Sequence, residues 1–289
     1  MTSPPFDSVV WIDGRLVPAT EATVSIFDRS FLYGDGLFET VRIHRSTPLH
    51  WDRHLHRLRE GAKALRLQIP YSDAEITDTA QAMIRRQSAT EAILRLTLSR
   101  GIGRRGYSIR GAHQPRLIIT VHALPDVPPD AAEGWKLATS EYRLPARDPL
   151  TRFKTANKLI QVMARAEAED AGADEALLLD TDGHLAETAS GNLFWIADGV
   201  VWTPPLSTGA LAGVTRSVVL ELAPRLGLQS GEKLQGLPTL LRTDGVFVTQ
   251  SSRGIISVTQ VDGTPVAASP IIVRLREAYW AEAAKSGTP

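Results

Sequence analysis

Cysteine is absent from this chain of 289 residues. Without a thiol there is no disulfide, no thiolate metal site and no cysteine nucleophile, and the best sequence clue to the redox compartment is missing as well. The chain has no excess charge of either sign, because 32 Lys and Arg balance 32 Asp and Glu. Overall charge therefore favours neither nucleic acid nor an anionic membrane as a partner, and any anion site must be built locally.

Long apolar runs are absent too. No stretch approaches the roughly 18 apolar residues of a membrane span. The beginning, MTSPPFDSVVWIDGRL, has no basic start followed by an apolar run, so it does not resemble a signal peptide. We therefore expect a cytoplasmic protein without a membrane segment. At 43% hydrophobic residues, the chain can bury a sizeable core.

Strand-like and helix-like patterns alternate along the chain. An Asp13-Gly14 turn between two short strands predicts a hairpin over 9–18. Leu55, Leu58 and Ala62 recur at helical spacing in 51–67, and Ser72 with Glu75 forms a capping box before another helix. Further strands are expected at 38–45, 93–99, 116–124, 136–140, 175–180, 192–197, 245–249 and 255–261, and further helices at 157–171, 215–226 and after 270.

A proline-rich segment interrupts this alternation. Prolines 125, 128 and 129 make residues 125–134 the expected connector between two domains. The sequence thus predicts an α/β (α+β) protein with a small N-terminal α/β domain, residues 1–124, and a larger C-terminal domain, residues 135–289.

The glycines at 101, 103 and 106 spell G-x-G-x-x-G after an expected strand. The residues that follow lead through a loop into another strand and open no helix for a pyrophosphate, so a dinucleotide site is not favoured. A basic loop fits better, and guanidinium groups suit carboxylate substrates, although a solvated Arg-rich turn explains the pattern equally well. The arginines of this loop are Arg100, Arg104, Arg105 and Arg110.

Two histidines, His50 and His54, would share one helical face. No third ligand accompanies them in a recognisable pattern, so no metal site is expected.

One segment carries most of the chemical information: RFKTANKLIQVMARAEAEDAGADEALLLDTDGHLAETASGNLFW, residues 152–195. It resembles the central signature of class IV (fold type IV) aminotransferases, in which K-x-x-N and E-x-x-x-x-N-x-F boxes follow in this order. The resemblance implies pyridoxal 5′-phosphate (PLP) as cofactor, with Lys154 binding it as a Schiff base. Such a lysine must lose its proton near neutral pH, which burial near other cations favours.

The resemblance also implies residues that hold the cofactor. Glu187 would pair with the pyridine nitrogen and keep the ring an electron sink, and Asn192 belongs to the same box. Arg57 and Ser251 stand where the family contacts the phosphate. Backbone N–H groups at an expected helix start, together with the Thr215 hydroxyl, would complete the phosphate site. The implied cofactor-binding residues are Arg57, Lys154, Glu187, Asn192, Val214, Thr215 and Ser251.

Further matching motifs are FDRSFLYGDGLFETVR, GALAGVTR and VFVTQSSRGIISVTQVDG, so the resemblance covers nearly the whole chain. It implies the D-amino acid aminotransferase-like fold, with a barrel-like sheet in the larger domain, a homodimer, and small amino or keto acids as substrates.

Within the family, the SRGIGRRGYS loop is similar to that of lyases that convert 4-amino-4-deoxychorismate to 4-aminobenzoate and pyruvate. Glu39 departs from lyases that carry threonine at that point, although other members have glutamate. The alternatives are a transaminase for D-amino acids or branched-chain L-amino acids and, more remotely, a non-catalytic scaffold. Arg105 is the candidate for a substrate carboxylate, with Arg104 or Arg110 as alternatives. The other expected pocket residues are Tyr33, Thr40 and Ser252.

Overall fold

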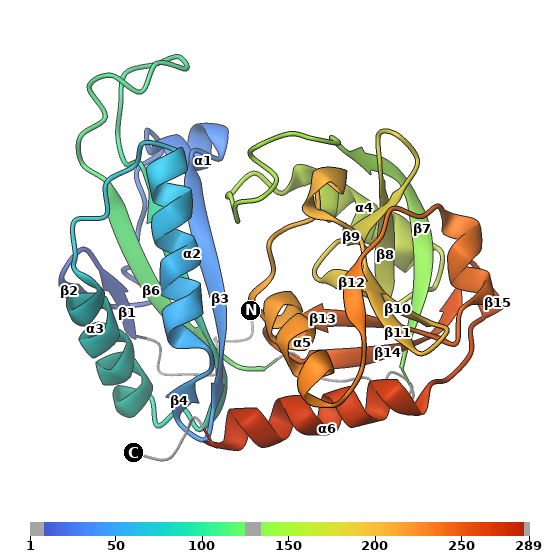
Figure 1. Ribbon diagram of the computed structural model, residues 1–289. Coiled ribbons are helices and arrows are strands. Elements are labelled where there is room, and N and C mark those ends of the chain that lie inside the picture. The colour runs from blue at the N-terminus through green and yellow to red at the C-terminus, as the bar shows by residue number, and fades with distance from the viewer. Residues whose placement is uncertain (1–8, 125–133, 286–289) are drawn as a thin grey trace. The chain divides into compact units, whose positions relative to one another are not determined.

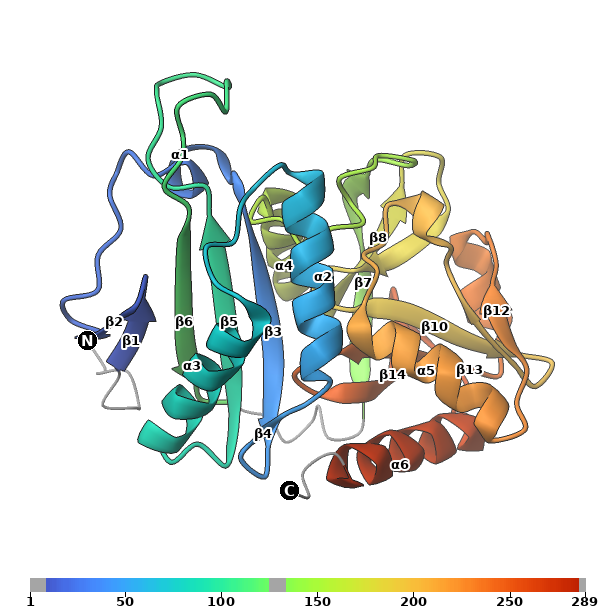
Figure 2. The same cartoon turned by 60° about the vertical axis from the view of Figure 1, so that its left-hand side comes forward.

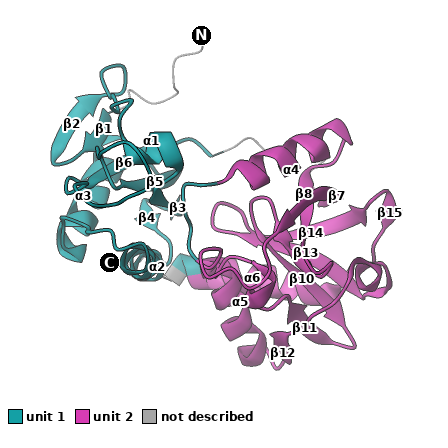
Figure 3. Ribbon diagram, turned by 90° about the horizontal axis from the view of Figure 1, so that it is seen from above, with its two compact units in different colours: residues 1–125, 153–157, 283–289 teal, residues 126–152, 158–282 magenta. Residues whose placement is uncertain are grey.

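The computed structural model describes residues 9–124 and 134–285, which fall into two compact units (Figure 1, Figure 3). The first comprises residues 1–125, 153–157 and 283–289, and the second comprises 126–152 and 158–282. The expected connector, 125–134, lies outside the described residues except for Gly134. No helix among the described residues has the length and apolar character needed to cross a bilayer.

The first unit is an antiparallel sheet of order β2-β1-β6-β5-β3-β4 with helices α2 and α3 against it (Figure 2). Apolar side chains from both helices and from alternate strand positions form its core. The elements are β1 (Val9–Ile12), β2 (Arg15–Pro18), α1 (Arg29–Tyr33), β3 (Gly36–His44), β4 (Thr47–Pro48), α2 (Trp51–Ala64), α3 (Asp73–Arg86), β5 (Glu91–Ser99) and β6 (Arg116–His122).

The second unit contains a closed barrel. Strands β10, β13, β14, β7, β8 and β9 pair in this order, and a β9–β10 pairing closes the ring, while β11, β12 and β15 lie off it. The elements are β7 (Trp135–Leu144), α4 (Leu159–Asp170), β8 (Glu175–Asp180), β9 (Leu185–Thr188), β10 (Asn192–Ala197), β11 (Val200–Thr203), α5 (Val214–Arg225), β12 (Ser230–Glu232), β13 (Gly245–Gln250), β14 (Gly254–Val261), β15 (Thr264–Pro265) and α6 (Pro270–Lys285), with short 3₁₀ helices at Leu206–Thr208 and Leu237–Arg242.

The two faces of the barrel strands carry separate apolar clusters. Leu193 and Val248 belong to a cluster contributed by all six ring strands, which fills the interior. Phe194 and Phe247 point the other way, toward α5 and α6, and their rings stack with centroids 4.8 Å apart. Both phenylalanines are fully buried, so truncating Phe247 to Ala is expected to cost about 3–5 kcal/mol.

The structure confirms the barrel-like sheet and the hairpin at Asp13-Gly14, as well as the capping box at Ser72. Helix α2 ends at Ala64 rather than at 67, because Arg66 adopts a left-handed conformation with φ of 51°. Helix α1 and the short strands β4, β9, β11, β12 and β15 were not expected. They are two to five residues long, too short for a hydrophobic period to mark them.

Candidate cofactor and substrate site

Lys154 is held beside the beginning of β3 by backbone hydrogen bonds. Phe38 N donates to Lys154 O at 3.0 Å, and Ala156 N donates to Gly36 O at 2.9 Å. The side chain of Lys154 is partly buried, with Nζ 4.4 Å from the centroid of the Phe38 ring. A cation over an aromatic face is stabilised electrostatically. The segment 153–157 thus fixes the lysine against one strand of the first unit.

Glu39, one residue after Phe38, points to the opposite face of β3 and is buried under α2. Arg57 Nε and Nη2 donate to its two oxygens at 2.8 and 2.6 Å, and His54 Nδ1 lies 2.7 Å from Oε2. Burial acts to raise the pKa of Glu39, but the charge and hydrogen bonds of Arg57 and His54 outweigh it and hold the pKa at about 2. Glu39 is therefore an ionised carboxylate inside the core.

His54 is buried and lies within electrostatic reach of Lys154. Burial lowers the pKa of His54, and the charges of Arg57 and Lys154 act in the same direction, against the opposing effect of Glu39. The imidazole is therefore neutral at pH 7, and its Nδ1–H donates to Glu39, because an ionised carboxylate only accepts. Of the two histidines considered above as metal ligands, His54 is thus explained by an ion-pair network.

Glu187, in the second unit, accepts hydrogen bonds from two residues of that unit. Its Oε2 accepts from Leu211 N at 2.9 Å and from Asn192 Nδ2 at 3.3 Å, and Asn192 Nδ2 also donates to Leu211 O at 2.9 Å. Both side chains are buried. Glu187 and Asn192 are also the register pair through which β9 meets β10. The backbone before α5 is therefore tied to the end of the barrel.

The N-terminus of α5 meets the requirements of an anion site. Its N-cap, Gly213, supplies no side-chain hydrogen bond, so the first N–H groups are open to an acceptor and the helix dipole favours negative charge. A Cβ on Gly213 would lie 1.9 Å from Asn192 Oδ1. The Thr215 hydroxyl is buried at 3% exposure and has no hydrogen-bond partner among the described residues. An unpartnered buried hydroxyl at a helix N-terminus fits the phosphate of PLP.

Of the expected substrate residues of the first unit, Tyr33 and Arg105 lie at the loop after β5, whereas Thr40 lies within β3 opposite Arg95. Gly106 N donates to the Tyr33 hydroxyl at 3.1 Å. Thr40 is partly buried on the same face of β3 as Phe38. The side chains of Arg104, Arg105 and Arg110 are exposed and no hydrogen bond or ion pair joins them to the described residues.

The remaining two candidates, Ser251 and Ser252, lie in the turn between β13 and β14. The Ser252 hydroxyl donates to Gln250 Oε1. The roles of these residues, like those of Arg57 and the other candidates, stay predictions.

Sequence reasoning missed Thr249, whose hydroxyl is buried at 2% exposure and has no partner in the part of the chain that the structure describes. Thr249 is in register with Asn192 across β13 and β10, so the side chains of these two residues lie on the same face of the sheet. Period-two alternation along β13 is the sequence signal that could have indicated this face. The contact of Phe38 with Lys154 had no signal in the sequence, because it joins segments more than 100 residues apart.

Comparison with known proteins identifies the family to which the chain belongs. The family model for amino-transferase class IV matches residues 36–261. The chain belongs to the class IV aminotransferases. It is 32% identical to a branched-chain-amino-acid aminotransferase of Pseudomonas aeruginosa, over 95% of this chain and 92% of that protein.

Solved structures of class IV enzymes superimpose on nearly the whole chain. The 4-amino-4-deoxychorismate lyase of Pseudomonas aeruginosa is 33% identical, with a TM-score of 0.85, 95% of this chain and 99% of that chain covered. A branched-chain amino acid aminotransferase of Thermoproteus uzoniensis, solved with norvaline, is 27% identical, with a TM-score of 0.89 and coverage of 97% and 96%.

A further branched-chain amino acid aminotransferase, solved with pyridoxamine 5′-phosphate, is 28% identical, with a TM-score of 0.89 and coverage of 98% of this chain and 96% of that chain. Class IV aminotransferases use PLP, so the predictions of an enzyme and of this cofactor are confirmed.

Proposed function

We propose that Lys154 is the residue to which PLP binds covalently and that the other predicted residues hold the cofactor. Glu187 would bind the pyridine nitrogen, since a carboxylate fixed by Leu211 N and Asn192 is oriented before the ring arrives. Thr215, Val214 N and Ser251 would bind the phosphate, together with Arg57. We add Thr249 to the residues proposed to bind the phosphate, because its buried hydroxyl also lacks a partner among the described residues.

The bound cofactor supplies an electron sink for the carbanion that forms when the substrate loses its Cα proton. Lys154 Nζ is the base that takes this proton. Arg95 Cζ lies over the same Phe38 ring as Lys154 Nζ, at 4.1 Å from the centroid, and the charges of Arg57 and Lys154 both act on the pKa of His54.

The substrate that fits best is 4-amino-4-deoxychorismate, and the enzyme would then be a lyase. The observation that carries this proposal is the cluster of exposed guanidinium groups in one loop, at Arg104, Arg105 and Arg110, because this substrate has two carboxylates and Arg binds each with paired hydrogen bonds. After Lys154 has taken the Cα proton, the ring C–O bond to the enolpyruvyl group would break, the leaving enolpyruvate would take up a proton to become pyruvate, and the ring would become that of 4-aminobenzoate.

Glu39 does not argue against the lyase. Its carboxylate is directed under α2 and occupied by Arg57 and His54, whereas Phe38 and Thr40 lie on the other face of β3. A glutamate at this position therefore acts on the arginine rather than on the substrate.

The second candidate is a transaminase. The specific observation in its favour is the 32% identity to a branched-chain-amino-acid aminotransferase over most of both chains. In that case Lys154 would move the proton taken from Cα, water would release a keto acid, and a second keto acid would accept the amino group that the cofactor had kept.

The experiment that separates the two is a product assay on the PLP form of the enzyme. With 4-amino-4-deoxychorismate, the lyase proposal expects pyruvate and 4-aminobenzoate at catalytic rates. With D-alanine, D-glutamate, L-glutamate or L-leucine it expects only slow change of the cofactor absorbance. Fast conversion by one of these amino acids without 4-aminobenzoate would replace the lyase by a transaminase and identify its donor.

We also propose a homodimer, with a second copy of this chain covering the apolar residues around α1. Ile26, Phe27 and Phe31 are exposed at 65, 62 and 70%, and contiguous apolar surface of this kind marks association sites. Sedimentation of the purified enzyme tests this, since a monomer at micromolar concentration would refute it. The cytoplasmic location stays a prediction.

A further inference from the structure

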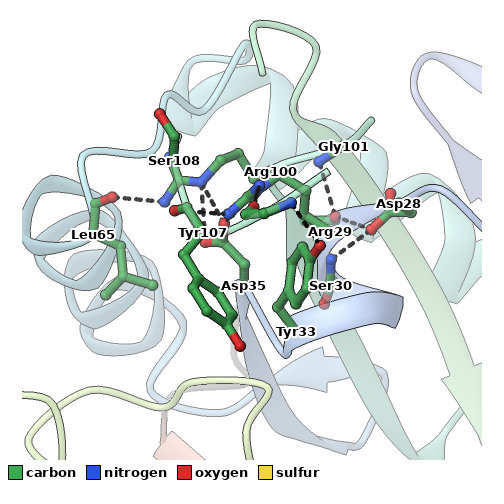
Figure 4. Close-up of polar contacts among 12 residues, drawn as sticks. Asp28, Arg29, Ser30, Tyr33, Asp35, Leu65, Arg100, Gly101, Tyr107 and Ser108 are labelled. Carbon is green, nitrogen blue, oxygen red and sulfur yellow. Dashed lines mark hydrogen bonds and ion pairs between the residues drawn. The ribbon is translucent and has the colours of Figure 1, made fainter. Parts of the chain in front are cut away.

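Arg29, in the FDRSFLYGDG motif, connects α1 to the loop after β5 (Figure 4). Its side chain is buried, and each nitrogen of the guanidinium donates a hydrogen bond. Nε donates to Asp35 Oδ2 at 2.8 Å, Nη1 to Gly106 O at 2.9 Å and Nη2 to Tyr107 O at 3.3 Å. The two carbonyls immediately follow Arg105. Arg29 therefore holds the tip of the loop from inside.

Asp35 orients this guanidinium and is shared with Arg100. Arg100 Nε donates to both oxygens of Asp35, at 3.0 and 2.8 Å, and its other nitrogens donate to the carbonyls of Leu65 and Arg66. Burial acts to raise the pKa of the Asp35 carboxyl, but the hydrogen bonds and charges of Arg100 and Arg29 outweigh it and lower that pKa. The carboxylate thus remains ionised and fixes Arg29 in one orientation.

The G-x-G-x-x-G motif, which the cofactor site does not use, is explained by this packing. Gly103 lies against Arg29, since a Cβ there would be 2.9 Å from Arg29 Cδ. Gly101 has φ of +80°, and a Cβ would meet Gln114 O at 1.8 Å, while Gly106 has φ of +102°. The glycines allow the loop to fold closely over the guanidinium. Tyr33 contacts the same part of the loop, because its hydroxyl accepts from Gly106 N at 3.1 Å. The centroid of its ring lies 5.0 Å from Arg29 Cζ.

We infer that Arg29 is a positioning residue for substrate recognition, which holds the 101–110 loop in the conformation that presents Arg104 and Arg105 to a substrate carboxylate. The inference rests on the proposed function of Arg105. Recognition of a planar carboxylate by a guanidinium depends on its direction, and the side chain of Arg105 has no partner of its own among the described residues. The direction of the Arg105 side chain must therefore come from the loop backbone. Arg29 fixes this backbone through its hydrogen bond to the carbonyl of the next residue, Gly106.

The test compares Arg29→Lys with Arg100→Lys as a matched control in the PLP enzyme. Both substitutions replace a buried guanidinium beside Asp35 by an ammonium, so a cation remains next to the carboxylate, and in Arg100→Lys the Asp35 carboxylate still accepts from Arg29 Nε. Of the two arginines, only Arg29 contacts the loop tip. Trypsin digestion measures how readily the loop opens at Arg104 and Arg105. Titration calorimetry measures the Kd of chorismate, which has both carboxylates of the proposed substrate and no amino group. Arg29→Lys is expected to be cleaved faster and to bind chorismate about tenfold more weakly, whereas Arg100→Lys stays within about twofold of wild type.

Two further variants complete the design. Gly103→Ala displaces Arg29 from the loop side, and the same two changes are expected even if Arg29→Lys does not fold. Arg105→Gln tests the proposed function: unchanged chorismate affinity in this variant would overturn the carboxylate role of Arg105. If Arg105→Gln weakens binding while Arg29→Lys and Gly103→Ala bind and are cleaved like wild type, the proposed function stands and the role of Arg29 is overturned. Equal effects in Arg29→Lys and Arg100→Lys would also overturn it, because a general loss of stability would then explain both.

Discussion

Glu39 and Arg57 form a two-point ion pair on the buried face of β3, with N–O distances of 2.8 and 2.6 Å. Both partners have given up hydration, so removing one leaves the other charged, buried and uncompensated. His54 adds a third hydrogen bond to the same carboxylate. This network lies beside the segment that carries Lys154, and it connects the stability of the first unit to the electrostatics of its candidate site.

Replacing Glu39 by Gln is expected to lower the free energy of unfolding at pH 7 by about 3 kcal/mol. The folded pKa of about 2 lies below the unfolded value of 4.5, so this contribution is complete above pH 4.5 and is lost as the pH falls toward 2. Urea denaturation of both proteins at several pH values checks this, and the difference between them should shrink in that window. The exposed Glu141, changed to Gln, serves as control. A difference that stays constant with pH would contradict the assignment.

Lys154→Ala should abolish turnover and the absorbance change that accompanies covalent cofactor binding, while leaving the thermal unfolding transition in place. The reason is that a side chain of three fewer methylenes and no amine offers neither a covalent bond nor a base. Lys158→Ala, four residues away at the N-cap of α4, is the control and is expected to keep its activity. Catalytic turnover by Lys154→Ala would refute the central role of this lysine.

The substitution Thr215→Val distinguishes a cofactor-binding role of the hydroxyl from a structural role, because the two roles predict different changes in stability and in the Kd of PLP. The hydroxyl has no partner within residues 9–124 and 134–285, so its removal should not lower the stability of the cofactor-free enzyme. The Kd of PLP should rise by about tenfold if the hydroxyl binds the phosphate.

The control for this prediction is Thr203→Val, at a buried threonine whose hydroxyl donates to Leu193 O at 2.8 Å. It should lose about 1–3 kcal/mol of stability without a change in cofactor affinity. If Thr215→Val behaved in the same way, Thr215 would be a structural residue.

Gly213→Ala should weaken cofactor binding through the neighbouring asparagine. The added methyl would lie 1.9 Å from Asn192 Oδ1, so Asn192 must move, and with it the hydrogen bonds to Glu187 and Leu211. We expect a rise of about tenfold or more in the Kd of PLP and a loss of about 1–3 kcal/mol in stability. Gly236→Ala is the control, because its new methyl group would be 3.7 Å from the nearest atom. Fluorescence titration with PLP measures both variants.

Much of the fold could be predicted from local patterns. Leu55, Leu58 and Ala62 repeat at helical spacing and are buried on one face of α2, and Ser72 with Glu75 determines where α3 begins. Strand β9 was missed because all four of its residues are buried, which removes the alternation that marks a half-buried strand.

The site was predictable only in part, since motif residues are local but their partners are not. The motif of Lys154 lies in one short segment, whereas the contact with Phe38 and the pairing of Glu39 with Arg57 depend on how distant segments pack. The same holds for Arg29, whose partners at Gly106 and Tyr107 are 77 and 78 residues away. No periodicity encodes such pairs, and only the assembled sheet brings them together.

The barrel of the second unit closes where β9 meets β10, and the register pair at this junction is Glu187 with Asn192. The side chains proposed to hold the cofactor ring therefore also lie at the junction that closes the barrel, where a single register pair joins β9 to β10. A cofactor bound to Glu187, as proposed, would stabilise the closed barrel at this junction. Loss of the cofactor should consequently speed amide hydrogen exchange in Leu185–Thr188 more than in β13. The holoenzyme and the cofactor-free enzyme would then differ in how often the barrel opens locally at β9.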